Sequence, residues 1–224
     1  MIKNISNLGD AALYCDFGQD VNKETNTKVI KYFKSIQKEN IQGINNLTPS
    51  YNKLIVSFDL KKTNFKSLKK KIEGLDTLNS NTLSGEKIEI PVCCDENFSL
   101  DIKRLEEKLK IDRENIYKNF FNKNFFCYMT GFIAGMPFLG DLDKTMRVKR
   151  LETPRVKVPK GSVGLTEQFA NIYTFESPGG WNIIGNTPKD IFDSSKEIEP
   201  NLINPGDTIT FIRITKEQYQ NYNE

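Results

Sequence analysis

The sequence predicts an α+β protein in which a small domain of alternating helices and strands precedes a domain built mainly of short strands. Three observations support this prediction. Helix-like and strand-like patterns alternate over the N-terminal third, residues 78–86 are polar and lack periodicity, and from about residue 125 onward short apolar runs are separated by glycine- and proline-containing turns. Many short strands with such turns are typical of a closed or nearly closed β-barrel. We therefore divide the chain into domains 1–85 and 86–224.

The first domain follows the order strand, helix, strand, strand, helix. Strand patterns cover residues 11–17, 42–51 (irregular, ending near Pro49) and 53–60, and helical spacing of apolar side chains covers residues 23–39 and 64–75. The side chains expected to face the core are Val29, Ile30, Phe33 and Ile36 on the first helix and Phe65, Leu68 and Ile72 on the second, which Gly74 ends. This order is that of a ferredoxin-like α+β sandwich.

The second domain begins with a strand at residues 87–94, KIEIPVCC, and continues with two short helices. Ser99 or Asp101 is expected to cap the first helix and Asp112 the second, because short polar side chains accept hydrogen bonds from the first helical N–H groups. The side chains expected to face inward are Ile102, Leu105 and Leu109 on the first helix and Ile116, Tyr117 and Phe120 on the second.

Composition indicates a soluble protein and excludes several classes of function. Hydrophobic residues make up 38% of the chain and charged residues 27%, and no apolar run approaches the roughly 18 residues of a membrane span. The start has no basic segment followed by an apolar stretch, so we expect a cytoplasmic protein without a secretion signal. A net charge of +3 is too small an excess to indicate nucleic-acid binding.

The chain contains no histidine, which excludes Ser-His-Asp and Cys-His catalysis and most zinc sites. Acid–base chemistry must therefore use Asp, Glu, Lys, Tyr or Cys, or come from a partner. No metal site is predicted. The four cysteines form no C-x-x-C pair and are interpreted as reduced structural thiols: Cys15, Cys93, Cys94 and Cys127.

Residues 146–164 place six cations in a short span. On a strand, Arg155 and Lys157 would share one face, while Val156 and Val158 would enter the barrel wall from the other. Arginine suits carboxylates and phosphates, and the turn that follows can present backbone N–H groups to an anion. The alternative interpretation is an edge strand that its charges keep soluble.

Two further glycine-containing stretches can shape a surface. Residues 132–142, FIAGMPFLGDL, lack the Gly-Lys-Ser/Thr of a P-loop and are interpreted as a barrel corner; a paired-carboxylate role for Asp141 and Asp143 is the weaker alternative. The only tryptophan, Trp181, follows a Pro-Gly-Gly corner. It is expected to plug an end of the barrel, or else to form one wall of a ligand or partner groove.

These segments resemble those of the family of 5-oxoprolinase B subunits, also known as allophanate hydrolase subunit 1, which includes an inhibitor of a sporulation histidine kinase. The similarity rests on PGGWNIIGNTP at 178–188 followed by IFD, on GFIAGMPFLGDLD at 131–143 and on PRVKVPKGSVG at 154–164. GDAALYCDFG near the start, Pro49 and Tyr51 before a strand, IEIPV at 88–92 and NPGDTITF at 204–211 extend it over the whole chain.

The resemblance implies a ferredoxin-like N-terminal domain and a cyclophilin-like β-barrel. It also implies that the chain acts with a C-type partner, itself built on related barrels, and with an A-type protein. Such complexes open the lactam 5-oxoproline to glutamate using ATP with Mg, and cationic side chains and backbone amides would stabilise the developing charge. The candidate substrate- or anion-binding residues are Arg150, Arg155, Lys157, Gly161 and Ser162. The candidate groove-lining residues are Gly135, Phe138, Gly179, Gly180 and Trp181.

The sequence departs from the family pattern at several of these places. Phe120 stands where the family has a histidine, and Ala134 and Phe138 replace a proline and a tyrosine. The paired arginines before the basic strand are reduced to Arg150 followed by Leu151. In the stretch after GSVG, the family's Gln-Thr-Gly is replaced by Phe169, Ala170 and Asn171.

We therefore expect the B-type component of a 5-oxoprolinase-type hydrolase, inactive when alone. Two alternatives remain open: a non-catalytic inhibitor of a histidine kinase, and a component of an allophanate or urea carboxyl-transfer system.

Overall fold

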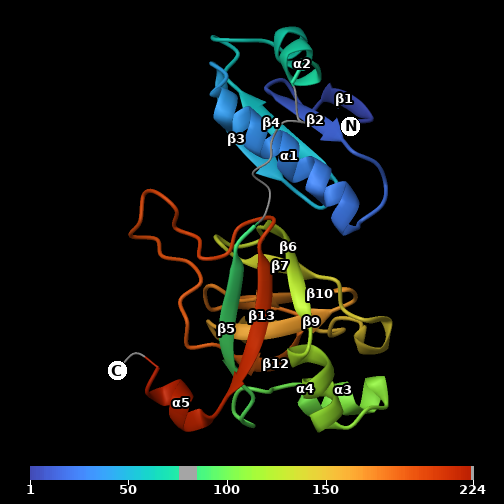
Figure 1. Cartoon of the computed structure of the whole chain (residues 1–224), viewed down its shortest axis with the longest axis vertical. Coiled ribbons are helices and arrows are strands. Elements are labelled where there is room, and N and C mark those ends of the chain that lie inside the picture. Colours follow the sequence, from blue (N-terminus) through green and yellow to red (C-terminus); the bar gives the residue numbers. More distant parts are fainter. Residues whose placement is uncertain (76–84, 223–224) are drawn as a thin grey trace. The chain divides into compact units, whose positions relative to one another are not determined.

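The computed structural model describes residues 1–75 and 85–222, and the chain divides into two compact units, Met1–Ser84 and Gly85–Glu224. The predicted fold class is confirmed: one unit holds a separate antiparallel sheet with two helices, and the other holds a closed seven-stranded barrel (Figure 1). The polar segment in which we expected the boundary, residues 78–86, lies mostly outside the described residues. No helix of the described residues is long and apolar enough to cross a membrane.

The N-terminal unit contains a four-stranded antiparallel sheet in the order β1-β2-β4-β3. Its strands are β1 (Asn4–Asn7), β2 (Ala12–Asp16), β3 (Ile44–Pro49) and β4 (Lys53–Phe58), and its helices are α1 (Lys23–Glu39) and α2 (Phe65–Glu73). The predicted strand-helix-strand-strand-helix order is present. The sequence did not predict β1, which pairs with β2 and occupies the edge of the sheet.

Side-chain caps set where the two helices begin. Asn22 Oδ1 accepts a hydrogen bond from the Thr25 N–H at 2.9 Å, and Asn64 Oδ1 accepts one from the Ser67 N–H at 3.0 Å. Gly74 lies at the C-terminal end of α2, as expected. The helices bury their apolar faces in the core of this unit, which contains the predicted side chains Val29, Ile36, Leu68 and Ile72, with Phe33 and Phe65 partly buried against it. Ile30 is also buried.

The barrel closes in the order β10-β7-β6-β13-β5-β12-β9. Its strands are β5 (Lys87–Cys93), β6 (Asn124–Thr130), β7 (Pro137–Gly140), β9 (Ser162–Thr166), β10 (Phe169–Ile172), β12 (Asn182–Asn186) and β13 (Thr208–Ile214). β5 and β13 are parallel, and Figure 1 shows them side by side; the other neighbours are antiparallel. The barrel therefore has no free edge along these strands.

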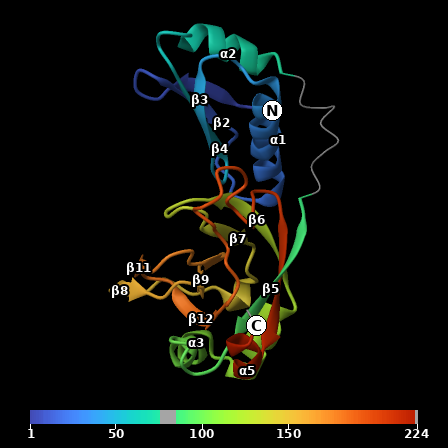
Figure 2. The same cartoon turned by 90° about the vertical axis from the view of Figure 1, so that its left-hand side faces the viewer.

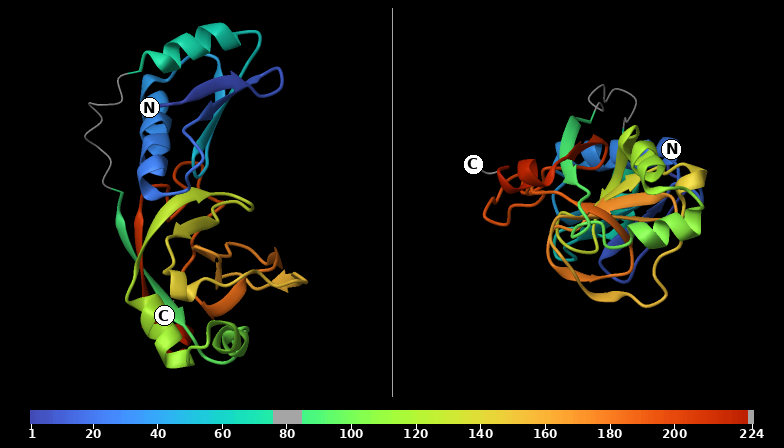
Figure 3. Two further views of the ribbon diagram at one scale, coloured as in Figure 1. Left: turned by 90° about the vertical axis from the view of Figure 1, so that its right-hand side faces the viewer. Right: turned by 90° about the horizontal axis from the view of Figure 1, so that it is seen from below.

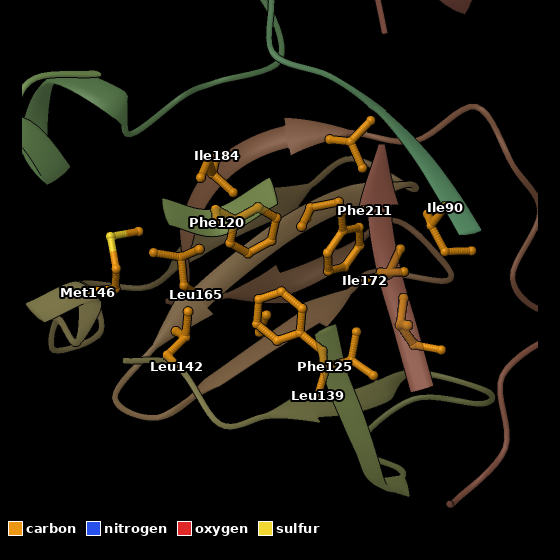
Figure 4. Packing of buried hydrophobic residues seen from close by; sticks show 14 of the residues in the cluster. Ile90, Phe120, Phe125, Leu139, Leu142, Met146, Leu165, Ile172, Ile184 and Phe211 are labelled. Carbon is orange, nitrogen blue, oxygen red and sulfur yellow. The ribbon is translucent and has the colours of Figure 1, made fainter. Parts of the chain in front are cut away.

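Apolar side chains fill the barrel (Figure 4), and helix α4 lies at one end of it (Figure 1). Phe120 of α4 (Arg113–Phe121) stacks on Phe211 with ring centroids 4.9 Å apart and lies 5.1 Å from the Phe125 ring. The predicted cap is confirmed, because Asp112 Oδ1 accepts from the Asn115 N–H at 3.0 Å. Phe120, which was predicted to face inward, is thus part of this aromatic core.

Short elements complete this unit. They are α3 (Ile102–Leu109), a 3₁₀ turn η1 (Lys144–Met146) and α5 (Lys216–Gln220), whose start carries a capping box of Thr215 and Gln218. Helix α5 lies at the same end of the barrel as α3 and α4 (Figures 1 and 3). The strands β8 (Arg155–Val158) and β11 (Ser177–Gly179) pair only with each other and form a two-stranded ribbon outside the barrel.

Candidate functional site

The β8–β11 ribbon projects from one side of the barrel and holds the basic motif and the Pro-Gly-Gly corner together (Figure 2). Beneath it lies a small apolar cluster separate from the barrel core, formed by Met136, Val158, Tyr173 and Ile183, which we call the outer cluster. Side chains alternate between the two faces of a strand, so the outer cluster uses the faces of β12 and its neighbours that point away from the barrel interior.

Trp181 lies on the side of the barrel wall that carries the outer cluster. Its ring meets Phe138 edge-to-face at 5.6 Å, and only 8% of the residue is exposed. A Cβ atom added at Gly164 would come within 2.9 Å of the Trp181 Cβ, so the tryptophan lies directly over that glycine. The expectation that Trp181 plugs an end of the barrel is therefore wrong, and the wall-forming alternative describes its position better.

Arg155 is bound within the protein. Its Nη2 and Nη1 donate to the two carboxylate oxygens of Asp101 at 2.7 and 3.0 Å. Asp101, which is 5% exposed, also accepts from the Ile183 N–H at 2.7 Å. Asp101 stands at the N-cap position of α3 but its side chain makes no capping hydrogen bond, so it serves the ribbon instead of the helix. Arg155 is thus committed to a structural pair, which ties β8 to α3 and β12.

The Tyr173 phenol lies at the centre of the outer cluster and is 1% exposed. Burial raises its pKa, which keeps the phenol neutral at physiological pH. Hydrogen bonds with the Asn171 side chain and the Trp181 backbone oppose this effect, and so do the charges of Arg150 and Arg155. The phenol is therefore hydrogen-bonded to the Trp181 backbone, and the charges of two predicted cations, Arg150 and Arg155, act on its pKa.

Gly179 and Gly180 differ in what surrounds them. A Cβ added at Gly179 would lie 2.0 Å from the Tyr173 hydroxyl oxygen, whereas one added at Gly180 would meet nothing closer than Pro154 at 3.5 Å. The carbonyl of Gly180 accepts from the Leu151 N–H at 2.7 Å. Gly179 is therefore required for the close approach of the ribbon to the phenol, and Gly180 is not.

The turn after β8 does not offer free N–H groups to an anion. Gly161 has a φ of +80°, its N–H donates to the Tyr173 carbonyl at 2.7 Å, and its carbonyl accepts from the Thr187 N–H. The Ser162 N–H donates to the Pro159 carbonyl at 3.2 Å. Beside this turn lies a pocket of about 170 Å³, lined by Lys160, Gly161, Tyr173, Thr174, Thr187, Pro188, Lys189, Asp190, Ile191 and Tyr219.

The remaining predicted cations lie at the surface. Arg150 is exposed and its charge reaches the Tyr173 phenol. Lys157 is also exposed and pairs with Glu176 across the ribbon at 2.8 Å. The prediction that both valines enter the barrel wall is wrong, because Val156 is 81% exposed and Val158 is buried in the outer cluster outside the barrel. The reason is that β8 pairs with β11 in a ribbon and is not a barrel strand.

The two glycine-rich corners lead to neighbouring surfaces. Gly135 has a φ of +69°, and a Cβ added there would lie 2.5 Å from the Phe192 ring. Asp141 and Asp143 are not paired with each other, because Asp141 accepts from the Tyr128 hydroxyl at 2.8 Å and Asp143 binds Lys123 at 2.8 Å. The paired-carboxylate alternative therefore finds no support in this geometry.

Phe169, Ala170 and Asn171, for which the resemblance predicted a replaced Gln-Thr-Gly, lie in barrel strand β10. Ala170 points into the barrel core, while Phe169 packs edge-to-face on Tyr128 at 5.5 Å. Asn171 is fully buried beside Gly164, and its Nδ2 lies 3.9 Å from the Met136 sulfur. Within residues 1–75 and 85–222, the buried Asn171 Oδ1 has no hydrogen-bond partner.

Sequence reasoning did not assign a role to Tyr173, Asn171 or the Asp101 carboxylate beyond a possible cap. Tyr173 follows β10 by one residue, where an alternating pattern could have indicated an outward aromatic side chain. The Asp101–Arg155 pair joins residues 54 positions apart, and the local sequence carries no signal for it. Of the ten predicted site residues, the structure gathers Arg155, Phe138, Gly179 and Trp181 around the outer cluster.

Comparisons with known proteins agree on one family. The family model described as "Carboxyltransferase domain, subdomain C and D" matches residues 3–203. The chain is 29% identical to the 5-oxoprolinase B subunit of Bacillus subtilis (strain 168), over 98% of this chain and 96% of that protein. It is 31% identical to the 5-oxoprolinase B subunit of Haemophilus influenzae (strain Rd KW20), over 93% of this chain and 97% of that protein.

Solved structures share the fold. The structure of TTHA0988 superposes with a TM-score of 0.82 at 26% sequence identity. The match covers 91% of this chain but only 40% of the TTHA0988 chain. The same fold is therefore found there as a part of a longer polypeptide.

Proposed function

Because the chain belongs to the family of the carboxyltransferase domain, subdomains C and D, we propose that it is the B-type component of an ATP-dependent 5-oxoprolinase. One observation carries the proposal. Two proteins named as 5-oxoprolinase B subunits match this chain over nearly the whole of both lengths, so the similarity extends to both structural units. The reaction would open the lactam of 5-oxoproline to give glutamate, with ATP activating the lactam oxygen.

The site at the outer cluster supports a role in binding an anionic substrate. Arg150 is an exposed cation of the basic motif, and its charge lowers the pKa of the buried Tyr173 phenol, which burial raises. We assign Arg150 to the substrate carboxylate or to the charge that develops on the lactam oxygen. Arg155 is a positioning residue, because its guanidinium is held by Asp101.

ATP and its Mg do not fit the groups this chain presents at the glycine turn. A phosphate loop needs backbone N–H groups that are free to donate, and those of Gly161 and Ser162 already donate to Tyr173 and Pro159 carbonyls. We therefore assign the nucleotide to the A-type or C-type partner, and we derive no step of this chain through it. This division of labour explains why the chain would be inactive alone.

Reconstitution tests the proposal. The chain is mixed with its C-type and A-type partners, and phosphate release from ATP is measured with and without 5-oxoproline. The expected result is release that requires 5-oxoproline and all three proteins, and that Arg150→Ala reduces at least about tenfold. Lys157→Ala is the matched control, because Lys157 is an exposed cation paired with Glu176 and should leave turnover unchanged. Lactam-independent release, or none with any partner, would contradict the proposal.

A second candidate is carboxyl transfer, which the match to a carboxyltransferase family model favours. The same mixture of the chain with its partners distinguishes lactam opening from carboxyl transfer. If a carboxyl-transfer reaction is the true one, 5-oxoproline will not stimulate phosphate release, whereas urea together with bicarbonate will do so when a biotin-carrying partner is added.

A further inference from the structure

Aromatic side chains from three separate segments gather on one side of the C-terminal unit. Phe132 lies in the loop between β6 and β7 and is 71% exposed, and Phe175, which precedes β11, is 41% exposed. Phe175 packs on Phe192 with ring centroids 5.7 Å apart. We call Phe132, Phe175 and Phe192 the aromatic rim. Figures 2 and 3 show the β6–β7 loop and the β8–β11 ribbon projecting from the same side of this unit.

Specific contacts hold the three segments together. The carbonyl of Ala134, two residues after Phe132, accepts from the Thr174 hydroxyl at 2.6 Å, and Thr174 immediately precedes Phe175. Gly135 lies against the Phe192 ring, where a side chain would clash. The aromatic rim is therefore a built surface rather than three unrelated loop tips.

The backbone at Phe132 is strained to present its ring to solvent. Its φ is +72°, a left-handed conformation that bulky side chains rarely adopt because their Cβ atom is crowded by the backbone. The loop is held closed by the Gly131 N–H, which donates to the Met136 carbonyl at 3.0 Å, and by Ile133, which packs on the outer cluster. Neither contact requires an exposed phenylalanine, and strain of this kind concentrates where a residue is needed for binding.

The exposed part of the aromatic rim fits the centre of a protein interface and not a whole one. An aromatic side chain has about 150–250 Å² to bury, but Phe132 is 71% exposed, Phe175 is 41% exposed and Phe192 is half-buried. The rim therefore offers only part of the roughly 800 Å² that one partner contributes to an interface of standard size. The neighbouring ribbon adds Val156, which is 81% exposed, and Pro178, which is exposed. Aromatic anchors surrounded by smaller apolar groups are typical of the residues that dominate binding energy.

We propose that the aromatic rim is the docking surface for the C-type partner, with Phe132 as the anchor that enters an apolar pocket of that protein. This inference rests on the proposed function. The choice of occupant also rests on TTHA0988, in which the same fold makes up 40% of a longer chain, so that further protein accompanies this fold covalently. An apolar anchor predicts binding that depends weakly on salt, unlike steering by surface charges.

The test measures affinity for the C-type partner separately from turnover. Binding of the intact chain is titrated by calorimetry, and the variants are Phe132→Ser and Phe175→Ser. The matched control is Ile212→Ser, because Ile212 is 40% exposed and lies on β13, three strands away from both β9 and β10 around the closed barrel. We expect each rim variant to weaken binding at least about tenfold and the control to leave it unchanged. Circular dichroism of all variants confirms that they are folded.

The outcomes are distinguishable. If the wild-type chain binds and supports lactam-dependent phosphate release while the rim variants bind equally well, the docking surface is wrong and the proposed function stands. If the wild-type chain does not bind the C-type partner, both fail. A third outcome is that light scattering shows a dimer of this chain, which Phe132→Ser dissociates while binding of the C-type partner is unchanged. The aromatic rim would then bind a second copy of the chain, and the assignment to the C-type partner would be overturned.

Discussion

The Arg155 guanidinium and the Asp101 carboxylate form a two-point ion pair, with N–O distances of 2.7 and 3.0 Å, that fastens the β8–β11 ribbon to the start of α3. Asp101 is 5% exposed and also accepts a hydrogen bond from the Ile183 N–H. One carboxylate therefore joins a ribbon, a helix and a barrel strand. Arg155 of the basic motif, which suggested an anion site, therefore has a structural role: it holds the ribbon to the rest of the unit.

Removing Arg155 should destabilise the C-terminal unit more than removing any exposed cation of the motif. Arg155→Ala leaves the buried Asp101 carboxylate without its charged partner, which costs about 3 kcal/mol of unfolding free energy. Lys157→Ala should cost less than about 0.5 kcal/mol, because its pair with Glu176 is exposed. Urea unfolding followed by Trp181 fluorescence measures both. Equal losses of unfolding free energy in the two variants would show that the Arg155–Asp101 pair does not stabilise the attachment of the ribbon.

The Cys94 thiol should be nearly unreactive although it lines a surface groove with Arg213. Burial raises its pKa to about 12, and the neighbouring Arg213 offsets this only in part. At pH 8 only about one thiol in ten thousand is then a thiolate, which is the reactive form. We expect Ellman's reagent to label native Cys94 at least about a thousandfold more slowly than the unfolded chain. Rapid labelling that Cys94→Ser abolishes would contradict this.

The N-terminal sheet should lose stability in acid through Asp16. A hydrogen bond from Lys53 and one from the Gly18 N–H lower the pKa of Asp16, and the two side chains lie opposite each other on β2 and β4. A lowered carboxylate pKa gives stability that is present above the unfolded pKa, about 3.9, and lost as pH falls through the folded value.

Lys53→Met should therefore lower the unfolding free energy at pH 7 by about 1 kcal/mol, and the difference from wild type should disappear as the pH falls through the lowered pKa of folded Asp16. Far-UV circular dichroism in urea from pH 2.5 to 7 measures this. Lys28→Met removes an exposed helix pair with Glu24 and serves as the control, with an expected loss of at most about 0.5 kcal/mol. A Lys53 effect that is independent of pH would point to lost packing instead.

Local signals predicted the helices well and the site poorly. Helix α1 has the predicted bounds because apolar spacing and the Asn22 cap act within a few residues. Strand β1 was missed because Asn4–Asn7 has one apolar side chain, Ile5, and becomes a strand only through pairing with β2. The outward position of Val156 likewise depends on a distant pairing, that of β8 with β11. Such non-local partners leave no periodic trace in the sequence.

The site shows the same limit at the level of single atoms. The residue types of the basic motif indicated anion binding, and for Arg150 that remains a prediction. Residue types alone could not indicate that the Asp101 carboxylate would bind the Arg155 guanidinium. Nor could they indicate that the Gly161 N–H would donate to the Tyr173 carbonyl. Only the fold decides which donors are left free.

The Pro-Gly-Gly corner offers a matched pair of substitutions that tests how the ribbon covers the phenol. Gly179→Ala would place a methyl group 2.0 Å from the Tyr173 hydroxyl oxygen, so the ribbon must lift or the phenol must move. Overpacking of this kind costs about 1–3 kcal/mol. Gly180→Ala meets its nearest atom at 3.5 Å, which is ordinary contact, and should change the unfolding free energy by less than about 0.5 kcal/mol.

The clash at Gly179 is with the Tyr173 hydroxyl oxygen itself. Adding Tyr173→Phe to Gly179→Ala should therefore recover part of the lost unfolding free energy, whereas adding it to Gly180→Ala should recover none. Trp181 reports the change directly, since it is the only tryptophan and is hydrogen-bonded through its backbone to the same phenol. We expect its emission to shift to longer wavelength in Gly179→Ala as the ribbon lifts and admits water. An unshifted emission together with unchanged stability would mean that the ribbon does not rest on Tyr173, and the grouping of Trp181 with Arg150 and Arg155 around the phenol would then have to be abandoned.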